Sequence, residues 1–300
     1  MRRRRIRQLL PMLRRQSRQS DSHAGALSAV ILTGLLLAIS TPLAAQSADE
    51  VVVPNFWNQT QRTVAIGETD IDVIRFVTTD DYPPFNFVDP SDRLIGFNVD
   101  LARAICEALG IPCTIQVRPF DDLLTTAVGD RADAAIAGIA ITQATRQLVA
   151  FSDVYLRLPA RFVVRRGLPL EVEDVAGREV AVVEGTAHEA YLEAFFPTAE
   201  IIPFADDRAA QNALRSGEAD YLFGDGVSLS FWLGGSTAGN CCQFTGGPYL
   251  ESAFFGQGMA IALDPGQPGL VAAVNAALRS VHASGEYAAI YLRYFPIGIY

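Results

Sequence analysis

The sequence predicts an α/β protein in which mostly parallel sheets are flanked by helices and divided between two lobes. From Val73 onward, strand-like segments alternate with segments whose apolar residues recur at helical spacing. This order is typical of βαβ units, which place strands in parallel. A second, similar alternation follows residues 161–167, and a chain of 300 residues that is 50% hydrophobic can bury two modest cores.

Each element follows from a local pattern. Pro83 and Pro84 place a loop after the first strand, and Thr142 is a residue type that commonly begins a helix. In the first lobe we expect strands at 73–79, 113–119 and 132–141, and helices at 96–110, near 121–130 and from Thr142. Further on we expect a strand and a helix within 171–196, a helix end and a strand within 213–225, a glycine-punctuated strand at 247–263, and a long helix at 270–285 before the closing segment 287–295.

The N-terminal residues resemble an export signal. A stretch rich in arginine precedes the apolar segment 24–39, and the sequence TPLAAQS follows. The apolar segment has 16 residues, fewer than the roughly 20 that a membrane-spanning helix needs. We therefore expect a signal peptide at 1–45 with cleavage near Ala45, a retained anchor being the alternative, and an N-terminal extension at 46–72 with little regular structure.

The charge balance excludes two classes of partner. The chain contains no lysine, and removal of residues 1–45 leaves 16 arginines against 32 acidic residues, a formal charge of −16. A chain this acidic is repelled by phosphate backbones and by anionic lipid surfaces. We expect no nucleic-acid partner and no binding to a membrane surface.

Four cysteines in an exported chain can form disulfides. Cys106 lies near the end of the helix expected at 96–110 and Cys113 begins the next strand, so a bond between them would clamp that turn. Two small buried thiols are the alternative. Cys241 and Cys242 are adjacent and either form a vicinal bridge or stay reduced. The chain has no C-x-x-C pair, and we expect no metal and no cofactor.

A series of motifs occupies nearly the whole chain from residue 73 to residue 296. In order they are TTDDYPPFNF, GFNVDLARAI, FDDL with a later G-x-x-x-D-A, IT with a later FSD-x-Y, VAVVEGT, GEAD-x-LF-x-D, FGQGMAIAL and G-x-YA-x-IY-x-x-YF. This series resembles the polar amino-acid-binding proteins that serve ABC importers, the bacterial extracellular solute-binding proteins of family 3. An ordered series of this length is far more specific than any single motif.

The resemblance implies a type II periplasmic-binding-protein fold, in which two hinge crossovers join two lobes that close on a small solute. It implies lobe 1 at 73–157 plus 256–300, lobe 2 at 158–255, and crossovers near 156–161 and 253–259. The spacing of Cys106 and Cys113 also resembles a short disulfide of histidine-type members, which favours that bond. The implied function is a monomeric periplasmic receptor that captures an amino acid or a similar small zwitterionic or acidic solute and docks on an inner-membrane ABC permease.

A free amino acid is a zwitterion, so its binding site needs a guanidinium for the carboxylate and a carboxylate for the ammonium group. Thr142 would cap a helix whose N–H groups attract anions, and Arg146 on that helix can bind a carboxylate through two nitrogens. The resemblance assigns the ammonium group to Asp225, at the end of a strand in lobe 2. The alternatives are a solvated arginine and a turn aspartate.

The same motifs imply further ligand contacts. Tyr82 and Phe120 match rings that enclose the bound side chain, plain core aromatics being the alternative. Thr186 matches a helix N-terminus that offers N–H and hydroxyl groups to the carboxylate, and Glu184 precedes it, whereas His188 is expected on a helix surface. The small residues Ala137, Gly138 and Ala140 at a strand end let a ligand approach the backbone. The remaining expected site residues are Thr79, Gly138, Ile139 and Ala140.

The chain departs from the family pattern at several positions. Ala137, Gly138 and Ala140 replace residues that often carry hydroxyls, and Ala187 stands where a second hydroxyl is frequent. The usual arginine comes three residues after the threonine of the IT pair, where this chain has Thr145, and Arg146 comes about 100° further round a helix. Either the backbone shifts so that Arg146 points inward, or the carboxylate site is altered. Thr79 stands where an aspartate often meets a basic side chain, which favours a neutral or modestly polar solute unless Asp80 or Asp81 substitutes.

Two other functions use the same scaffold. Cyclohexadienyl dehydratases are similar in fold and use an acidic group in the cleft to protonate a leaving hydroxyl. Glu184 is the candidate acid, and a strand-end hydrogen-bonding role is its alternative. The detached sensory domain of a kinase would carry downstream membrane and signalling segments, and we do not expect it. No Ser-His-Asp arrangement or H-E-x-x-H motif is visible, so we expect reversible binding without catalysis.

Overall fold

Two five-stranded mixed sheets form the framework of the described chain. A computed structural model describes residues 51–56, 71–129 and 131–300. The expected signal peptide lies outside these residues, as does most of the expected extension at 46–72. Within the described part of the chain, none of the helices has the length and apolar character to cross a membrane.

The first sheet has the strand order β5-β1-β6-β13-β7. β1 pairs in parallel with β5 and β6, whereas β13 is antiparallel to both β6 and β7, so β13 alone runs against the other strands. Side chains alternate between the faces, because Ile74 and Phe76 belong to one core cluster and Val77 to another. The strands are β1 (Ile74–Thr78), β5 (Cys113–Val117), β6 (Ala134–Ala135), β7 (Ala150–Phe151) and β13 (Ala262–Leu263).

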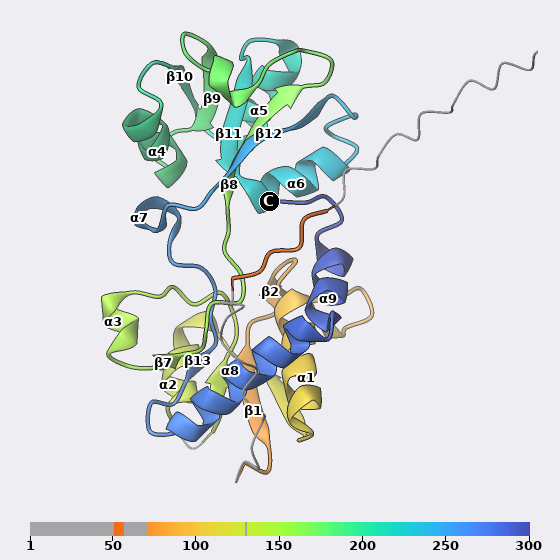
Figure 1. The fold of residues 1–300 in the computed structure, drawn as a ribbon, viewed down its shortest axis with the longest axis vertical. Helices are drawn as coiled ribbons and strands as arrows, with labels where there is room; N and C mark the ends of the chain where they lie inside the picture. The colour runs from red at the N-terminus through yellow and green to blue at the C-terminus, as the bar shows by residue number, and fades with distance from the viewer. Residues whose placement is uncertain (1–50, 57–70, 130) are drawn as a thin grey trace, which may run out of the picture. The chain divides into compact units, whose positions relative to one another are not determined.

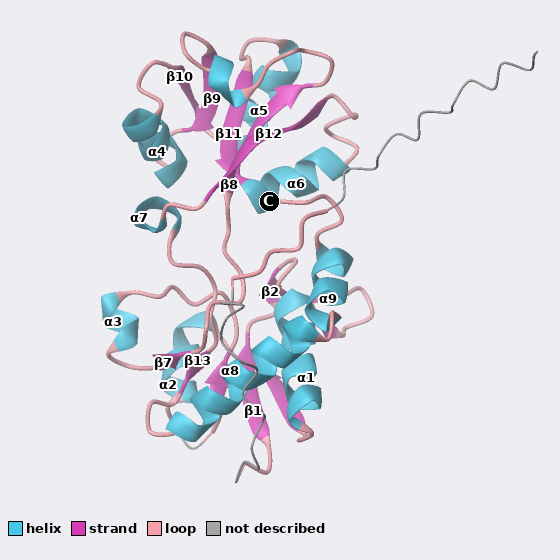
Figure 2. Ribbon diagram, in the orientation of Figure 1, coloured by secondary structure: helices cyan, strands magenta, loops and turns pink. Residues whose placement is uncertain are grey.

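Helices cover both faces of the first sheet (Figures 1 and 2). Three of them contact one another and bury their apolar sides in the core cluster that contains Phe76. They are α1 (Phe97–Leu109), α8 (Pro268–Ala283) and α9 (Glu286–Tyr294). On the other face, α2 (Leu123–Ala127) follows a 3-10 turn at Phe120–Asp122 and packs on Val77. The short α3 (Gln143–Arg146) lies between β6 and β7 in the chain.

The second sheet has the strand order β10-β9-β11-β8-β12. β9, β10 and β11 are parallel, and β8 is antiparallel to both β11 and β12. Each sheet therefore has one reversed strand, which confirms the predicted mixed, mostly parallel architecture. The strands are β8 (Ala160–Arg165), β9 (Glu179–Val183), β10 (Glu200–Phe204), β11 (Tyr221–Asp225) and β12 (Cys242–Tyr249).

The second sheet is also buried on both faces. Phe162 and Val164 of β8 belong to one core cluster, and Val163 belongs to another. The surrounding elements are a 3-10 turn at Val172–Asp174, α4 (Ala187–Phe195), α5 (Asp207–Ser216), α6 (Gly226–Gly234) and α7 (Ser252–Phe255).

The two connections between the sheets pair with each other. One runs from β7 to β8 and the other from β12 through α7 to β13. They meet at a bridge in which the Met259 N–H donates to the Leu156 carbonyl oxygen at 2.6 Å and the Tyr155 N–H donates to the Met259 carbonyl oxygen at 2.9 Å. The bounds of the two lobes stay a prediction.

The structure contains disulfides at both pairs of cysteines. Cys106 near the end of α1 is bonded to Cys113 at the start of β5, with Cα atoms 6.1 Å apart. Cys241 and Cys242 form a vicinal bridge at the start of β12. The sequence alone left this second pair undecided.

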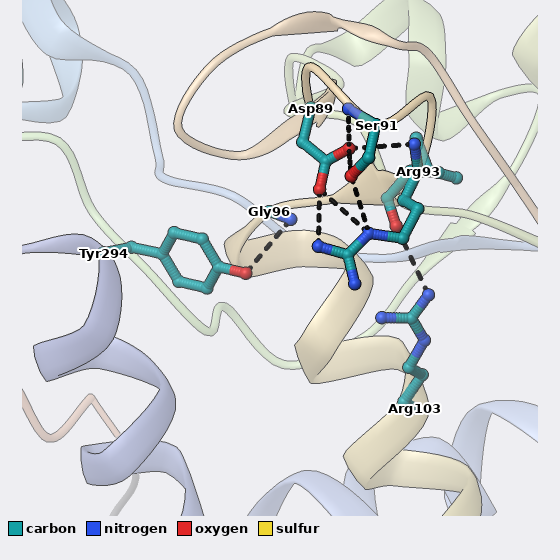
Figure 3. Close-up of polar contacts among 7 residues, drawn as sticks. Asp89, Ser91, Arg93, Gly96, Arg103 and Tyr294 are labelled. Carbon is teal, nitrogen blue, oxygen red and sulfur yellow. Dashed lines mark hydrogen bonds and ion pairs between the residues drawn. The ribbon is translucent and has the colours of Figure 1, made fainter. Parts of the chain in front are cut away.

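A small sheet of β2 (Asp81–Tyr82), β3 (Asn86–Val88) and β4 (Leu94–Ile95) precedes α1. Polar contacts fix its β3–β4 turn (Figure 3). The Asp89 carboxylate accepts hydrogen bonds from the Ser91 hydroxyl and the Arg93 guanidinium, each at 2.7 Å, and these bonds lower the pKa of Asp89. The Gly96 N–H donates to the Tyr294 hydroxyl at 3.1 Å, which ties the start of α1 to α9. β2, which carries Tyr82, pairs with β3 and so belongs to the same small sheet.

Two of the predicted elements were wrong in extent or type. The single strand expected at 247–263 is the end of β12, the helix α7 and the short strand β13. The helix begins after Glu251, which has an extended backbone, and it ends at Gly256, whose φ of 77° few other residues adopt. The strand expected at 132–141 pairs only at Ala134 and Ala135, and the left-handed Gly138 (φ 68°) follows it.

Candidate functional site

The strand end after β6 packs against Tyr82. A Cβ atom built on Gly138 would lie 3.1 Å from Cε1 of the Tyr82 ring, so only glycine permits this approach at its left-handed φ. The Tyr82 ring also contacts Phe85, with ring centroids 4.9 Å apart. The structure thus brings two expected site residues together. Ile139 is 4% exposed and belongs to the core, so it can offer a ligand only its backbone.

The capping of α3 explains the departure from the family pattern. Thr142 is the N-cap, and its hydroxyl accepts from the Thr145 N–H at 3.1 Å. The Thr145 hydroxyl in turn accepts from the Thr142 N–H at 2.9 Å and donates to the Ala140 carbonyl oxygen at 2.8 Å. This reciprocal arrangement is a capping box. Thr145, at the position where the family pattern places arginine, therefore stabilises the helix start and the strand end.

Arg146 is exposed and bonded to a residue far away in the sequence. Its Nη2 donates to Oε1 of Gln257 at 2.9 Å, and its guanidinium carbon lies 5.9 Å from the centroid of the Phe151 ring. Gln257 belongs to the connection between α7 and β13. Within the described residues, no hydrogen bond or ion pair joins Arg146 to another of the expected site residues. Its role in binding stays a prediction.

Thr79 belongs to a buried network of polar side chains. The Asn86 amide donates to the Thr79 hydroxyl at 2.7 Å, and the Asn98 amide donates to Oδ1 of Asn86 at 2.9 Å. The Tyr155 hydroxyl donates to Oδ1 of Asn98 at 2.8 Å. Thr79 is 5% exposed. Satisfied buried networks hold their members in place, so Thr79 has a structural role whether or not a ligand touches it.

A cavity of about 240 Å³ adjoins this network. Its lining brings the expected site residues Thr79 and Phe120 together, and Phe120 is 55% exposed. Asp80 and Asp81 line the same cavity and are both exposed. Position 79, where family members often have an aspartate, is a threonine here. Asp80 and Asp81 instead supply carboxylates at the next two positions, and they share the lining with the Phe120 ring.

Three expected site residues lie at the end of a strand of the second sheet or shortly after one. Asp225 ends β11 and caps α6, accepting a hydrogen bond from the Ser228 N–H at 2.8 Å. Thr186 caps α4, accepting from the Glu189 N–H at 3.3 Å and donating to the Val183 carbonyl oxygen at 2.7 Å. Glu184 directly follows β9 and is exposed. As in other α/β folds, polar groups gather where strands lead into helices.

The charge of Asp225 reaches groups on both sides of the connections. Burial raises the pKa of Tyr82, and the Asp225 carboxylate raises it further. Burial lowers the pKa of His188, which Asp225 and then Asp207 partly offset. Asp225 is thus a common, secondary cause of both shifts, after burial.

His188 is the residue that sequence reasoning missed. Its ring stacks on Phe255 of α7, with centroids 5.2 Å apart and planes 26° apart. It is half-buried instead of lying on an exposed helix surface. No sequence signal could have found it, because its ring neighbours Phe223 and Phe255 come from β11 and α7. Within the part of the chain that the structure describes, no cluster of three or more potential metal ligands occurs.

An ion pair holds the strand that leads to Gly138. Asp133, directly before β6, is 7% exposed and accepts bonds from Arg75 of β1: Nε at 3.0 Å, Nη2 at 2.7 Å and the backbone N–H at 2.8 Å. Burial opposes ionisation of Asp133, but these bonds outweigh it and lower the pKa of the carboxyl group. The pair fixes β6 beside β1.

We expect Asp133→Asn to lower the free energy of unfolding by about 1–3 kcal/mol at pH 7, the range for a lost charged hydrogen-bond partner. Because the folded pKa is depressed, the stabilisation is complete above the unfolded value of about 3.9 and is lost as pH falls below it. Urea unfolding at pH 7 and at pH 3 measures this. A difference between wild type and variant that is as large at pH 3 as at pH 7 would contradict it.

Comparison with known proteins identifies the family. The model of the bacterial extracellular solute-binding proteins, family 3, matches residues 74–297. The chain belongs to this family. Among curated solute-binding proteins, the L-arginine-binding protein of Pseudomonas aeruginosa is 30% identical over 223 residues, which cover 73% of this chain and 86% of the relative. The lysine/arginine/ornithine-binding periplasmic protein of Escherichia coli is 27% identical over 233 residues, covering 76% and 90%.

A solved structure supports the same fold for this family 3 solute-binding protein. The L-cystine solute receptor of Neisseria gonorrhoeae, in its unliganded open conformation, matches with a TM-score of 0.66. It is 18% identical and covers 76% of this chain and 94% of that chain. The predicted two-lobed type II periplasmic-binding-protein fold is therefore confirmed, with its second sheet inserted between β7 and β13 of the first.

Proposed function

We propose that this protein is the periplasmic substrate-binding component of an ABC importer and that it captures an amino acid between the two sheets by hinge closure. The observation that carries the proposal is the family match over residues 74–297 on two sheets whose connections pair at Leu156 and Met259. In this proposal, Asp225 at the end of β11 holds the ammonium group of the ligand, and Tyr82 before α1 supplies an aromatic ring. Lobe 1 at 73–157 plus 256–300 and lobe 2 at 158–255 are part of the proposal.

The carboxylate of the ligand would meet donors from both sides. Arg146 lies on the first turn after the Thr142 cap, and Thr186 caps the longer α4. To bind the ligand carboxylate, the Arg146 guanidinium has to give up its hydrogen bond to Gln257. A charge-assisted bidentate bond is stronger than a bond to a neutral amide, so this exchange is favourable.

A basic amino acid is the first ligand to test. The relatives named above bind arginine by name, and the cavity beside Phe120 carries Asp80 and Asp81. A cationic side chain that reached this cavity would meet two carboxylates and an aromatic ring, which together have to outweigh the repulsion from Arg118 in the same lining. This proposal replaces the preference for a neutral solute that Thr79 alone suggested.

Isothermal titration calorimetry of the purified protein with L-arginine, L-glutamine and L-glutamate tests whether the protein binds an amino acid and whether it prefers a basic one. We expect L-arginine to bind at least about tenfold more tightly than L-glutamate, since each charged contact contributes on the order of 1.4 kcal/mol. Equal affinities would remove the proposed role of Asp80 and Asp81. If a thermal-shift screen of all amino acids produced no hit, binding of an amino acid would be wrong.

We further propose that binding occurs without turnover. The relatives carry the names of binding proteins, and Glu184, the candidate acid, is exposed to solvent. Incubation with prephenate or arogenate should leave both unchanged by chromatography. Export to the periplasm with cleavage near Ala45, a monomeric state and docking on an inner-membrane permease belong to the same proposal.

A further inference from the structure

The buried polar network that contains Thr79 is a chain of hydrogen bonds that leads to a cavity. Its members are the side chains of Tyr155, Asn98, Asn86 and Thr79, and Thr79 lines the cavity of about 240 Å³. All four residues are at most 5% exposed, so their polar groups depend on partners within the protein. The direction of the donors in this chain decides what Thr79 can offer to a ligand.

The backbone of Thr79 fixes the orientation of the Asn86 amide. Nδ2 of Asn86 lies 3.2 Å from the Thr79 carbonyl oxygen and 2.7 Å from the Thr79 hydroxyl oxygen. A carbonyl oxygen can only accept, so the amide nitrogen of Asn86, and not its oxygen, has to face Thr79. Both N–H groups of this amide are then used, and the Thr79 hydroxyl is the acceptor in its bond to Asn86.

The direction of the other bonds follows from this orientation. Because Oδ1 of Asn86 faces Asn98, the Asn98 amide has to donate with its nitrogen, at 2.9 Å. Oδ1 of Asn98 then faces the Tyr155 hydroxyl, which donates to it at 2.8 Å. Burial raises the pKa of Tyr155, so this hydroxyl keeps its proton. Each side chain of the network therefore donates towards the cavity.

The proton of the Thr79 hydroxyl is left for a ligand. The hydroxyl oxygen accepts from Asn86, and within the described part of the chain no residue accepts a hydrogen bond from this hydroxyl. Thr79 thus presents a donor to the cavity, and Arg118 in the same lining is a second group that can only donate. Asp80 and Asp81 line the cavity with acceptors. The lining therefore suits a group that both accepts and donates hydrogen bonds.

We propose that this cavity also accepts a neutral ureido side chain, and that Asn86 is the positioning residue that directs the Thr79 proton towards its oxygen. The inference rests on the proposed capture of an amino acid and names a further ligand class for the same site. The guanidinium of arginine has five N–H donors and no acceptor, so it suits Asp80 and Asp81 but opposes the Thr79 proton. In L-citrulline a carbonyl oxygen replaces one nitrogen group, and N–H groups remain for the carboxylates.

Comparison of L-citrulline with L-arginine tests the proposal, because the two molecules have nearly the same shape. L-Citrulline lacks the charge attraction to Asp80 and Asp81, which Arg118 already reduces, and it gains the bond from Thr79. We expect calorimetry of the wild-type protein to give affinities within about tenfold of each other. A larger difference in favour of L-arginine would contradict the proposal.

Thr79→Val removes the hydroxyl and keeps the shape of the side chain. We expect this variant to weaken binding of L-citrulline at least about fivefold more than binding of L-arginine. Thr79→Ser keeps a hydroxyl and should keep the wild-type ratio of the two affinities. The matched control is Thr114→Val, the same change at an exposed position of β5, which should also keep this ratio.

Asn86→Ala tests the positioning role. It removes the N–H group that bonds the Thr79 hydroxyl oxygen, so the hydroxyl can rotate and offer its oxygen to an N–H group of arginine. The affinity for L-citrulline relative to that for L-arginine should therefore fall at least about threefold. A role of Asn86 in folding alone would leave the ratio unchanged, because both ligands bind the same folded protein. If Asn86→Ala does not fold, the ratio in Thr79→Val decides.

The inference and the proposed function fail in different ways. If a thermal-shift screen of amino acids that includes L-citrulline finds no ligand, the proposed function is wrong and the inference fails with it. If an amino acid binds but L-citrulline does not, only the inference is overturned. The same holds if Thr79→Val leaves the ratio of the two affinities unchanged.

Discussion

Asp225→Asn is expected to weaken amino-acid binding by at least about 100-fold, because loss of a charged partner from a buried ion pair costs about 3 kcal/mol or more. Asparagine is nearly as good an N-cap as aspartate, so the bond from the Ser228 N–H can survive. The variant therefore removes the charge and leaves the start of α6 intact. Calorimetry with L-arginine measures the loss, and thermal melting should show a shift of only about 2 °C or less.

Asp206→Asn is the matched control for this variant. Asp206 also caps a helix of the same half of the chain, α5, and accepts from the Ala209 N–H at 2.8 Å. It is exposed, and it is not among the expected site residues. Its replacement should leave the affinity for L-arginine within about twofold of wild type. If Asp225→Asn behaved in the same way, the ammonium site would have been assigned to the wrong carboxylate.

Arg146→Gln is expected to weaken binding by at least about tenfold, the effect of a lost charge-assisted hydrogen bond to the ligand carboxylate. Glutamine has a helix propensity similar to that of arginine, and Thr142 and Thr145 would still cap α3. The fold should therefore be unaffected. Calorimetry with L-arginine again measures the change.

Gln257→Ala distinguishes ligand binding by Arg146 from a structural role. This substitution removes the partner that Arg146 has in the structure and frees its guanidinium. If Arg146 binds the ligand, the affinity should stay equal or rise. If the Arg146–Gln257 bond only orders the chain, both variants should weaken binding to the same degree. Full affinity in Arg146→Gln would show that donors such as the N-terminus of α4 hold the carboxylate without it.

The fold was largely predictable because its signals are local. Alternating strands and helices, with apolar residues at the matching spacing, indicate two α/β units, and the structure has both. The helix α7 could not be predicted, because its four residues Ser252–Phe255 are too few to show a helical period. The length of β6 depends on pairing with β1 and β13, and a single strand's sequence does not specify its partners.

Only those parts of the candidate site that depend on a local sequence motif could be predicted. Thr142 as a helix cap followed from its residue type, and the structure confirms that cap. The bond between Arg146 and Gln257 joins residues 111 positions apart. The approach of His188 to Phe255 likewise depends on how α4 and α7 pack. Such contacts arise from tertiary packing, and no local pattern encodes them.

The reciprocal bonds of Thr142 and Thr145 restrict how this pocket can be redesigned. A single Thr145→Arg change would restore the arrangement typical of the family, but it would also delete the hydroxyl that bonds the Thr142 N–H and the Ala140 carbonyl oxygen. Loss of a helix cap costs about 1 kcal/mol. A mutational path between the two arrangements therefore has to change the cap and the cation together, which makes positions 145 and 146 epistatic in any engineering of ligand specificity.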